Sequence, residues 1–450
     1  PVPGALWVGS VGTDGYLAPG QDNWQNNDID NFTQGAVDGS DAGAIIVTID
    51  GSAALSATGQ GASKGGALGT PALSGVTVTS IGGHATSATD ADENAFVGNG
   101  GDAGDINLTT EAGSTIIVDA GGDGGATGIY AYAQGGGLGQ AQNYYTGTPG
   151  TAGTVAVTHG GSITVSDPDG FGIYAAAVGG DGFENEATVL PTGNGYPADG
   201  GAVSVTLGSD ASITMGQGGV GIFGFSRAGS WEPFGSTFQP SGGTVAITLD
   251  DGASIRTGTG KGADFAMGAL AISAGNALVE KRGDNGEGSG NAGSITIDNA
   301  GDIATGGTLS FGLAALAVGG TPFVSSVNSG SNVIGNSGEI ASADGGSINV
   351  GHSGTITTPG DHAAGILALS SGGGGVVKND AAGVVNSDGT GFSAGTLLGA
   401  NTNSDAAATS GGSVEIDVSG TIATGGTAGS GIGAFGILAQ SIGGSGGMAG

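Results

Sequence analysis

The chain has 450 residues, of which 104 are glycine, 37% are hydrophobic and only 10% are charged. The glycine content excludes long helices, and because the glycines do not recur every third residue, collagen is excluded as well. The apolar fraction excludes a charge-extended disordered chain. The 39 acidic and 7 basic residues give a formal net charge of −32, which argues against nucleic acid and anionic membrane surfaces as partners. The absence of cysteine excludes disulfides, thiolate metal sites and Cys nucleophiles, and no apolar run is long enough to predict a membrane span.

A unit of three short strands recurs along the chain. Its first strand alternates apolar and polar residues, as is typical of strands rather than helices, and starts at 44, 105, 154, 202, 244, 294, 347 and 413. A second strand is centred on an isoleucine at 161–165, 211–215, 253–257, 301–305, 354–358 and 420–424. A third, more apolar strand starts at 75, 128, 172, 221, 268, 312, 365 and 436, and is followed by a variable loop rich in Gly, Asn and Asp.

Tandem units of this kind predict an all-β solenoid in which each unit forms one coil. Equivalent strands would stack in parallel, and the handedness of parallel crossovers favours a right-handed parallel β-helix with three strands per coil and a long variable loop after the third. A coil of two shorter rungs per unit is the alternative. We expect 1–43 to hold the end of a preceding coil and a loop, 44–412 to form seven coils, and 413–450 to start a further coil.

The two ends of the chain resemble interrupted coils. The run "GILAQSIGG" at 436–444 looks like the third strand of an eighth unit, and "GALWVGSVG" at 4–12 looks like the third strand of a preceding one. Neither end resembles the polar caps that close most solenoids. We therefore expect a segment of a longer repeat protein, or a subunit that stacks end to end on identical subunits.

The third strands are apolar on both faces, which is unusual for a half-buried strand. One face carries Ile and Ala, as at Ile129, Ala131, Ile173 and Ala175. The other, here called the stripe, comprises Tyr130, Tyr132, Tyr174, Phe223, Phe225, Leu270, Leu316, Leu367, Leu369 and Leu438. Either the following loops fold back over the stripe, or it docks a partner or another copy of the chain. The pattern does not decide which face points inward.

The loops carry two further sets of candidates. Aromatic residues suited to stacking on sugars or anchoring a protein are Tyr144, Tyr145, Phe183, Trp231, Phe234 and Phe238. They equally suit pinning the loops to the solenoid wall. Oxygen-rich clusters that could hold calcium comprise Asp28, Asp30, Asp90, Asp92 and Glu93, although Asp beside Gly is also ordinary turn chemistry. No other cofactor is indicated.

Catalysis finds little support in the sequence. The four histidines, His84, His159, His352 and His362, are scattered over different units, and no nucleophile motif accompanies them. Paired carboxylates on a β-helix could cleave a polysaccharide, but the scarcity of basic residues makes a poor site for acidic glycans. We therefore predict that the chain is not an enzyme, with a polysaccharide-cleaving β-helix enzyme as the third interpretation of function.

The segment "GTIATGGTAGSGIGAFGILAQSIGGSGG" at 420–447 resembles the repeat of large autotransporter passengers, the type V secreted surface proteins of Gram-negative bacteria. Weaker versions of the pattern extend from 44 to 450. The resemblance implies an extracellular or cell-surface location and a structural or adhesive role towards a host or cell-surface protein or glycan, and it transfers no catalytic residues. We expect a rigid rod that displays variable loops; the alternative is a self-assembling subunit of an extracellular filament.

Overall fold

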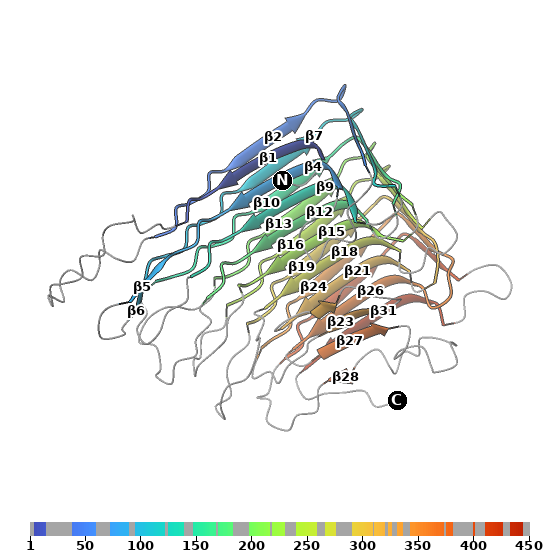
Figure 1. Cartoon of the computed structure of the whole chain (residues 1–450). Helices are drawn as coiled ribbons and strands as arrows, with labels where there is room; N and C mark the ends of the chain where they lie inside the picture. The colour runs from blue at the N-terminus through green and yellow to red at the C-terminus, as the bar shows by residue number, and fades with distance from the viewer. Residues whose placement is uncertain are drawn as a thin grey trace, which may run out of the picture.

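The computed structural model describes residues 4–14, 38–59, 73–89, 95–121, 125–138, 147–167, 170–182, 198–216, 218–229, 240–258, 266–275, 290–308, 310–319, 323–325, 331–335, 343–372, 375–380, 399–400, 410–425 and 433–443. These residues form strands, turns and extended segments, and none of them is helical. Most strands belong to three long parallel sheets that run in chain order from one end of the stack to the other, with β1 and β2 towards one end and β31 towards the other (Figure 1).

The three sheets correspond to the three strands of the repeated unit, which confirms the predicted parallel β-helix with three strands per coil. The first-strand sheet contains β2 (Ile45–Ile49), β7 (Ile106–Thr110), β10 (Val155–His159), β13 (Val203–Leu207), β16 (Val245–Leu249), β19 (Ile295–Asn299), β24 (Ile348–His352) and β29 (Val414–Val418). The second-strand sheet contains β3 (Ala54–Thr58), β8 (Thr115–Asp119), β11 (Ser162–Val165), β14 (Ser212–Met215), β17 (Ser254–Thr257), β20 (Asp302–Thr305), β25 (Thr355–Thr358) and β30 (Thr421–Thr424). The third-strand sheet contains β1 (Gly4–Val11), β4 (Leu73–Ile81), β9 (Ala126–Gln134), β12 (Phe171–Val178), β15 (Val220–Arg227), β18 (Met267–Ala274), β21 (Phe311–Val318), β26 (Ala364–Ser371) and β31 (Phe435–Ile442).

The core lies between the three sheets and is built from inward columns of similar residues. In the first strands burial alternates strictly, so that β10 buries Val155 and Val157 and exposes Thr158. The register repeats the unit without slippage: Ile173 pairs with Ile129 on one side and Ile222 on the other. Because a one-residue slip would turn the buried side chains outward, the pattern of each strand fixes its register on the preceding coil.

A column of glycines lets the second and third strands approach closely. A Cβ on Gly221 in β15 would collide with Cγ2 of Ile255 in the next coil and would lie 2.5 Å from the carbonyl oxygen of Gly268. The same arrangement, a glycine facing an Ile Cγ2 of the following coil, recurs at Gly75, Gly128, Gly172, Gly268, Gly312 and Gly365. We call these residues the glycine column. The high glycine content therefore has a packing cause along the third strands.

Acidic residues link successive coils in the segments that precede the first strands. The Asp102 backbone N–H donates to Asp41 Oδ1 (2.8 Å), and Asp102 Oδ1 in turn accepts from the backbone N–H (2.7 Å) and the hydroxyl (2.9 Å) of Thr151. Asp105 makes the same pair of bonds to Thr154. Asp199 and Asp344 accept backbone N–H bonds from later coils in the same way. Part of the acidic excess is thus structural.

Serines near the ends of third strands close the corner between one coil and the next. Ser273 donates to the Gly243 carbonyl oxygen (2.8 Å) and accepts from the Gly293 backbone N–H (2.8 Å). Ser226 and Ser370 bridge their own neighbouring glycine segments with the same geometry. These hydroxyls satisfy backbone groups that the parallel ladders leave unpaired, as buried backbone groups require.

Strands outside the three sheets come from the connections that follow third strands. β5 (Ser87–Thr89) and β6 (Ala95–Val97) form an antiparallel hairpin. β22 (Phe323–Ser325), β23 (Ser331–Gly335), β27 (Gly375–Asp380) and β28 (Gly399–Ala400) form an antiparallel sheet, in which β23 from one connection pairs with β27 from the next. The sequence predicted neither of these sheets.

Candidate binding face

The outer face of the third-strand sheet carries an apolar cluster separate from the core. On these strands the Ile and Ala face points inward: Ile129, Ile173 and Ile222 are fully buried in the core. The opposite face contributes to a second cluster, centred on Tyr130, Tyr174 and Phe223. The structure therefore decides the orientation that alternation alone left open, with the smaller and β-branched side chains inside.

Aromatic rings stack along this outer face. Tyr130, Tyr174 and Phe223 occupy one register column, and neighbouring ring centroids in it lie 5.0 Å apart. Phe171 packs edge-on against Tyr174, with centroids 5.3 Å apart. Such offset and edge-on pairs add to the stabilisation from area burial. In later coils the same column continues as Leu270, Ala314 and Leu367.

The predicted stripe residues all lie on this outer face. Seven of them are buried, with exposed fractions of 6% or less: Tyr130, Tyr174, Phe223, Leu270, Leu316, Leu367 and Leu369. Tyr132, Phe225 and Leu438 are partly buried. Burial within the chain favours the interpretation in which the chain itself covers this face. Self-association through the stripe stays a prediction.

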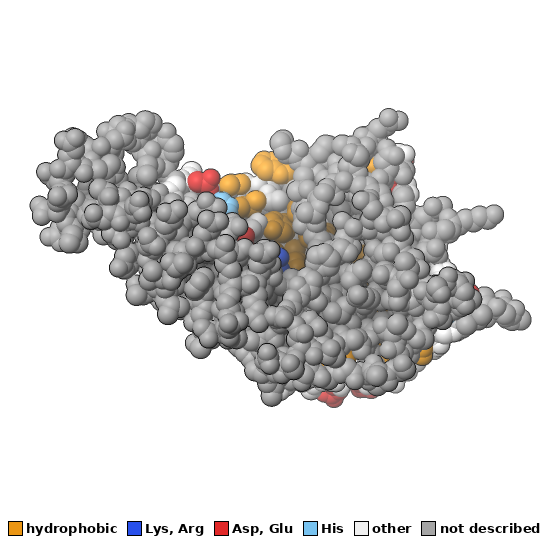
Figure 2. All heavy atoms as spheres, turned by 60° about the horizontal axis from the view of Figure 1, so that its bottom comes forward, with side chains coloured by type: hydrophobic (Ala, Val, Ile, Leu, Met, Phe, Trp, Pro, Cys, Tyr) orange, Lys and Arg blue, Asp and Glu red, His pale blue; other side chains and the backbone are white. Residues whose placement is uncertain are grey.

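A polar margin borders the aromatic column at the ends of the third strands. We call it the Arg227 margin and define it by Tyr132, Gln134, Tyr174, Asp181 and Arg227. The Tyr132 hydroxyl donates to Gln134 Oε1 (2.9 Å). Within the described residues, Arg227 Nε is buried and has no hydrogen-bond partner. On the face shown in Figure 2, described apolar side chains lie in a hollow with basic, acidic and histidine side chains beside them.

The tyrosine pKa values reflect this environment. Burial raises the pKa of Tyr130 and of Tyr174 well above the usual range. Burial also raises the pKa of Tyr132 to about 12; the nearby Arg227 charge opposes that rise, and Asp181 adds to it. The guanidinium of Arg227 lowers the pKa of Tyr174 in the same way, although burial prevails. The electrostatic effect of Arg227 thus reaches two aromatic side chains of earlier coils.

The loop and calcium candidates lie outside the described residues. This applies to Asp28, Asp30, Asp90, Asp92 and Glu93, and to the aromatic residues Tyr144, Tyr145, Phe183, Trp231, Phe234 and Phe238. Among the residues that the structure describes, no group of three His, Cys, Asp or Glu side chains could hold a metal ion. Calcium binding by the loops stays a prediction.

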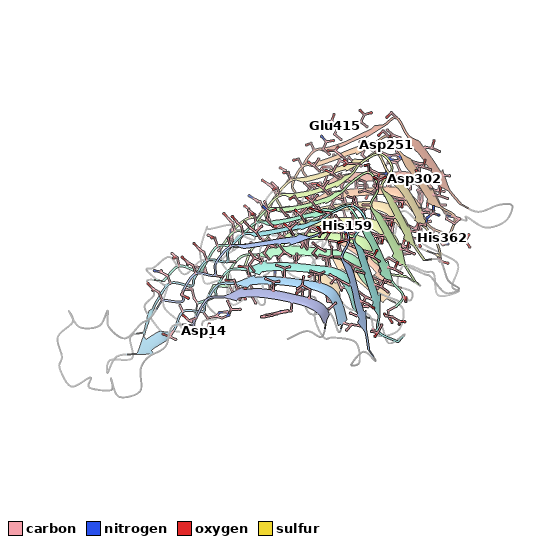
Figure 3. All side chains as sticks on the ribbon, turned by 90° about the horizontal axis from the view of Figure 1, so that it is seen from above. Asp14, His159, Asp251, Asp302, His362 and Glu415 are labelled. Carbon is pink, nitrogen blue, oxygen red and sulfur yellow. The ribbon has the colours of Figure 1, made fainter. Side chains whose placement is uncertain are left out.

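The histidines do not converge. Figure 3 shows His159 and His362 well apart, with Asp14, Asp251, Asp302 and Glu415 distributed along the solenoid. His159 is fully buried, with Nδ1 2.5 Å from the Thr110 hydroxyl oxygen. His352 is also buried: its Nε2–H donates to the Thr421 carbonyl oxygen (3.2 Å), and its Nδ1 accepts from the Asn299 amide nitrogen (3.0 Å). Both histidines pair polar groups at an inner corner of the coil.

Sequence reasoning missed Arg227, Gln134 and Asp181 as members of one site. The available signal was the register: Arg227 occupies an outward position whose neighbours in the adjacent coils are Val178 and Ala274. Arg227 is the one charged residue in a register column that also holds Gln134, Val178, Ala274, Val318 and Ser371, and in a chain with seven basic residues it is conspicuous once the coils are aligned.

Comparisons with known proteins give no relatives. No family model matches the chain, no curated protein resembles it significantly, and no solved structure matches its fold at a significant level. A search of the described residues for helices long and apolar enough to cross a membrane found none.

Proposed function

We propose that the chain is the shaft of an extracellular structural or adhesive protein on the surface of a Gram-negative bacterium. The observation that supports a mechanical role is the uninterrupted register of three parallel sheets, in which each coil is hydrogen-bonded to the next along all three strands. At a spacing of about 4.8 Å per rung, ladders of this kind make a stiff rod, and the connections after the third strands are carried on its side. The resemblance of 420–447 to autotransporter passengers supports the location.

Protease accessibility on intact cells tests this proposal. Intact cells of the source bacterium are treated with a protease, and the chain is followed with an antibody raised against the recombinant 450-residue protein. We expect loss of the signal from intact cells while a cytoplasmic marker is preserved. Full protection in intact cells, with digestion only after lysis, would contradict the proposal.

A filament subunit, in which identical chains stack end to end, is the second candidate. In the described stack, β1 and β31 each pair with one neighbour only. Side chains that are fully buried elsewhere are open there: Ile437 has 44% of its surface exposed, and Ile416 and Ile422 are only partly buried. An unpaired edge with exposed core residues can pair with a further coil, either of the same chain or of a second copy.

The glycine column supplies a test of stacking that spares the fold. A Cβ at Gly436 would meet no atom within 4 Å, although Gly436 occupies the same column as Gly221. If another copy stacks on β31, Gly436→Val should block filament growth while the circular dichroism spectrum stays unchanged. Gly59→Val, at another position with no atom within 4 Å, is the matched control. Sedimentation velocity and electron microscopy measure the outcome, and a wild-type chain that stays monomeric at high concentration would rule out the filament.

No described cluster of carboxylates favours the third interpretation, a polysaccharide-cleaving enzyme. The absence of activity stays a prediction, which polysaccharide-release assays of the purified chain can test.

A further inference from the structure

Between the third strand of one coil and the first strand of the next, the chain runs out to a connection and back in extended segments that belong to none of the sheets. The outgoing segments are 82–85, 135–138, 179–182 and 228–229, and the incoming segments are 39–44, 98–105, 147–154 and 198–202. We call them together the glycine slab. In Figure 1 they are the plain ribbons that continue the sheets towards one edge of the stack.

Backbone hydrogen bonds in the slab follow a period of three residues. In the incoming segment 98–105, successive N–H groups donate in turn to the preceding coil, to the following coil and to the outgoing segment. The first three bonds run from Asn99 to Asp38, from Gly100 to Thr148 and from Gly101 to Gly83. The cycle then starts again at Asp102, which donates to Asp41. A period of three without hydrogen bonds inside the segment is the geometry of the polyproline II helix, so the slab is a bundle of such segments.

Glycine allows the segments of the slab to lie in direct contact. A Cβ on Gly104 would collide with the backbone of Gly43 in the preceding coil, and a Cβ on Gly150 would collide with the carbonyl oxygen of Gly101. Only a residue without a side chain fits at such close approaches. The slab therefore has a packing requirement of its own, separate from that of the glycine column.

The same backbone bond closes the base of three successive connections. In each case an incoming residue donates to the carbonyl oxygen of the outgoing segment that precedes it. The N···O distances are 2.8 Å from Gly101 to Gly83, 2.8 Å from Gly150 to Gly136 and 3.0 Å from Ala198 to Gly180. The enclosed residues, 84–100, 137–149 and 181–197, differ in length and sequence. The closing bond is thus the same whatever chain lies between its ends.

We propose that the glycine slab is a mounting that fixes both ends of a connection independently of the length and sequence of that connection. The bonds at each base are made by backbone groups and by the Asp and Asn side chains of the slab. A change of sequence farther out then leaves the coils in place. The inference rests on the adhesive role proposed above: it assigns ligand specificity to the connections and stiffness to the shaft, so that the one can change without the other.

Replacement of the hairpin β5–β6 tests this proposal. The hairpin lies between Thr86 and Gly98, and the Gly98 N–H donates to the Thr86 carbonyl oxygen (3.3 Å). In the recombinant 450-residue protein, residues 87–97 are exchanged for a peptide epitope of equal length that a monoclonal antibody recognises. We expect the antibody to bind the folded chain. Amide hydrogen exchange of 82–85 and 98–105, measured by mass spectrometry, should match that of the wild type.

A substitution inside the slab gives the comparison. Gly104→Ala should make the amides of 98–105 exchange about tenfold faster or more, because overpacking a close contact destabilises it. Gly43→Ala is the matched control. Gly43 occupies the same column one coil earlier, where the new Cβ would meet only Ser10 Oγ, at 3.5 Å, and its slab amides should exchange at the wild-type rate.

Three results would overturn the proposal. Exchange in the hairpin replacement as fast as in Gly104→Ala would mean that the connection holds the slab, rather than the reverse. An epitope that the antibody reaches only after denaturation would mean that the mounting does not display what it carries. Equal exchange in Gly104→Ala and Gly43→Ala would remove the close approach as its cause. If Gly104→Ala does not fold, the hairpin replacement still decides. These experiments use the purified chain, so their result is independent of the cellular location that the protease experiment tests.

Discussion

Replacing one residue of the glycine column tests how the coils are held together. In Gly221→Ala the new Cβ would collide with Ile255 Cγ2 and lie 2.5 Å from the Gly268 carbonyl oxygen. Both neighbours are fixed, one by the core and the other by the sheet ladder. Overpacking a close-packed interior costs about 1–3 kcal/mol, and we expect the upper end here because a backbone atom takes part.

The measurement is urea unfolding followed by far-UV circular dichroism, together with amide hydrogen exchange of β15 and β18. Exchange is needed because a solenoid can open locally before it unfolds. Gly59→Ala, with no atom within 4 Å of the new Cβ, is the control and should change stability by less than about 0.5 kcal/mol. Unchanged unfolding in Gly221→Ala, or an equal loss in the control, would refute the packing argument.

The sequence itself suggests how the damage can be repaired. Register places Ala5 of β1 opposite Gly75, and at this junction the facing residue of the following coil is Leu55 instead of isoleucine. Leucine lacks the Cγ2 branch that meets the column. We therefore expect Ile255→Leu to recover part of the stability lost in Gly221→Ala, but not the part that is due to the Gly268 carbonyl oxygen.

Two further predictions concern the polar groups of the coil. Asp102→Ala should lower the free energy of unfolding by about 1 kcal/mol, because it removes the acceptor for both Thr151 donors. Asp102→Asn, which keeps Oδ1, should retain most of the stability. Thermal melts of the two variants test this difference. Burial lowers the pKa of His159 from 6.5 to about 4, so that below pH 6.5 the unfolded chain binds a proton that the folded chain does not. As the pH falls from 6.5 to 4, the free energy of unfolding should therefore decrease by up to about 3 kcal/mol. His159→Leu, which matches Leu207 and Leu249 in the same column, should lack this pH-dependent loss. Urea titrations of both chains at several pH values measure it.

Much of the fold could be predicted because the same sequence pattern recurs in successive coils. The alternation of each first strand fixed both its burial and its register. The second strands β3 and β8 were missed, since Leu55 and the run at 115–119 depart from the isoleucine-centred pattern of later coils. The inward face of the third strands could not be deduced, because both faces are apolar and only packing against the isoleucines of the second strands separates them.

The binding face was predictable in part. Alternation placed Tyr130, Tyr174 and Phe223 on one face, and the structure brings them into a single stack. The Arg227 margin was not predicted, because its members come from three different coils and only the register brings them together. The pairing of β23 with β27 was missed for a similar physical reason: it joins two connections that are far apart in sequence and have no repeated pattern.

The glycine column also gives the stack a direction. From Gly75 to Gly365, each glycine of the column faces an isoleucine of the coil that follows it, and none of them faces one of the coil that precedes it. The two ends of any run of coils are consequently unlike: one presents projecting methyl groups and the other presents recesses. Two such runs of coils could join head to tail, with the methyl groups of one end entering the recesses of the other. They could not join through a twofold axis, because that would bring two identical ends together. Any association of this chain through its ends would be heterologous and open, growing by addition rather than closing as a dimer.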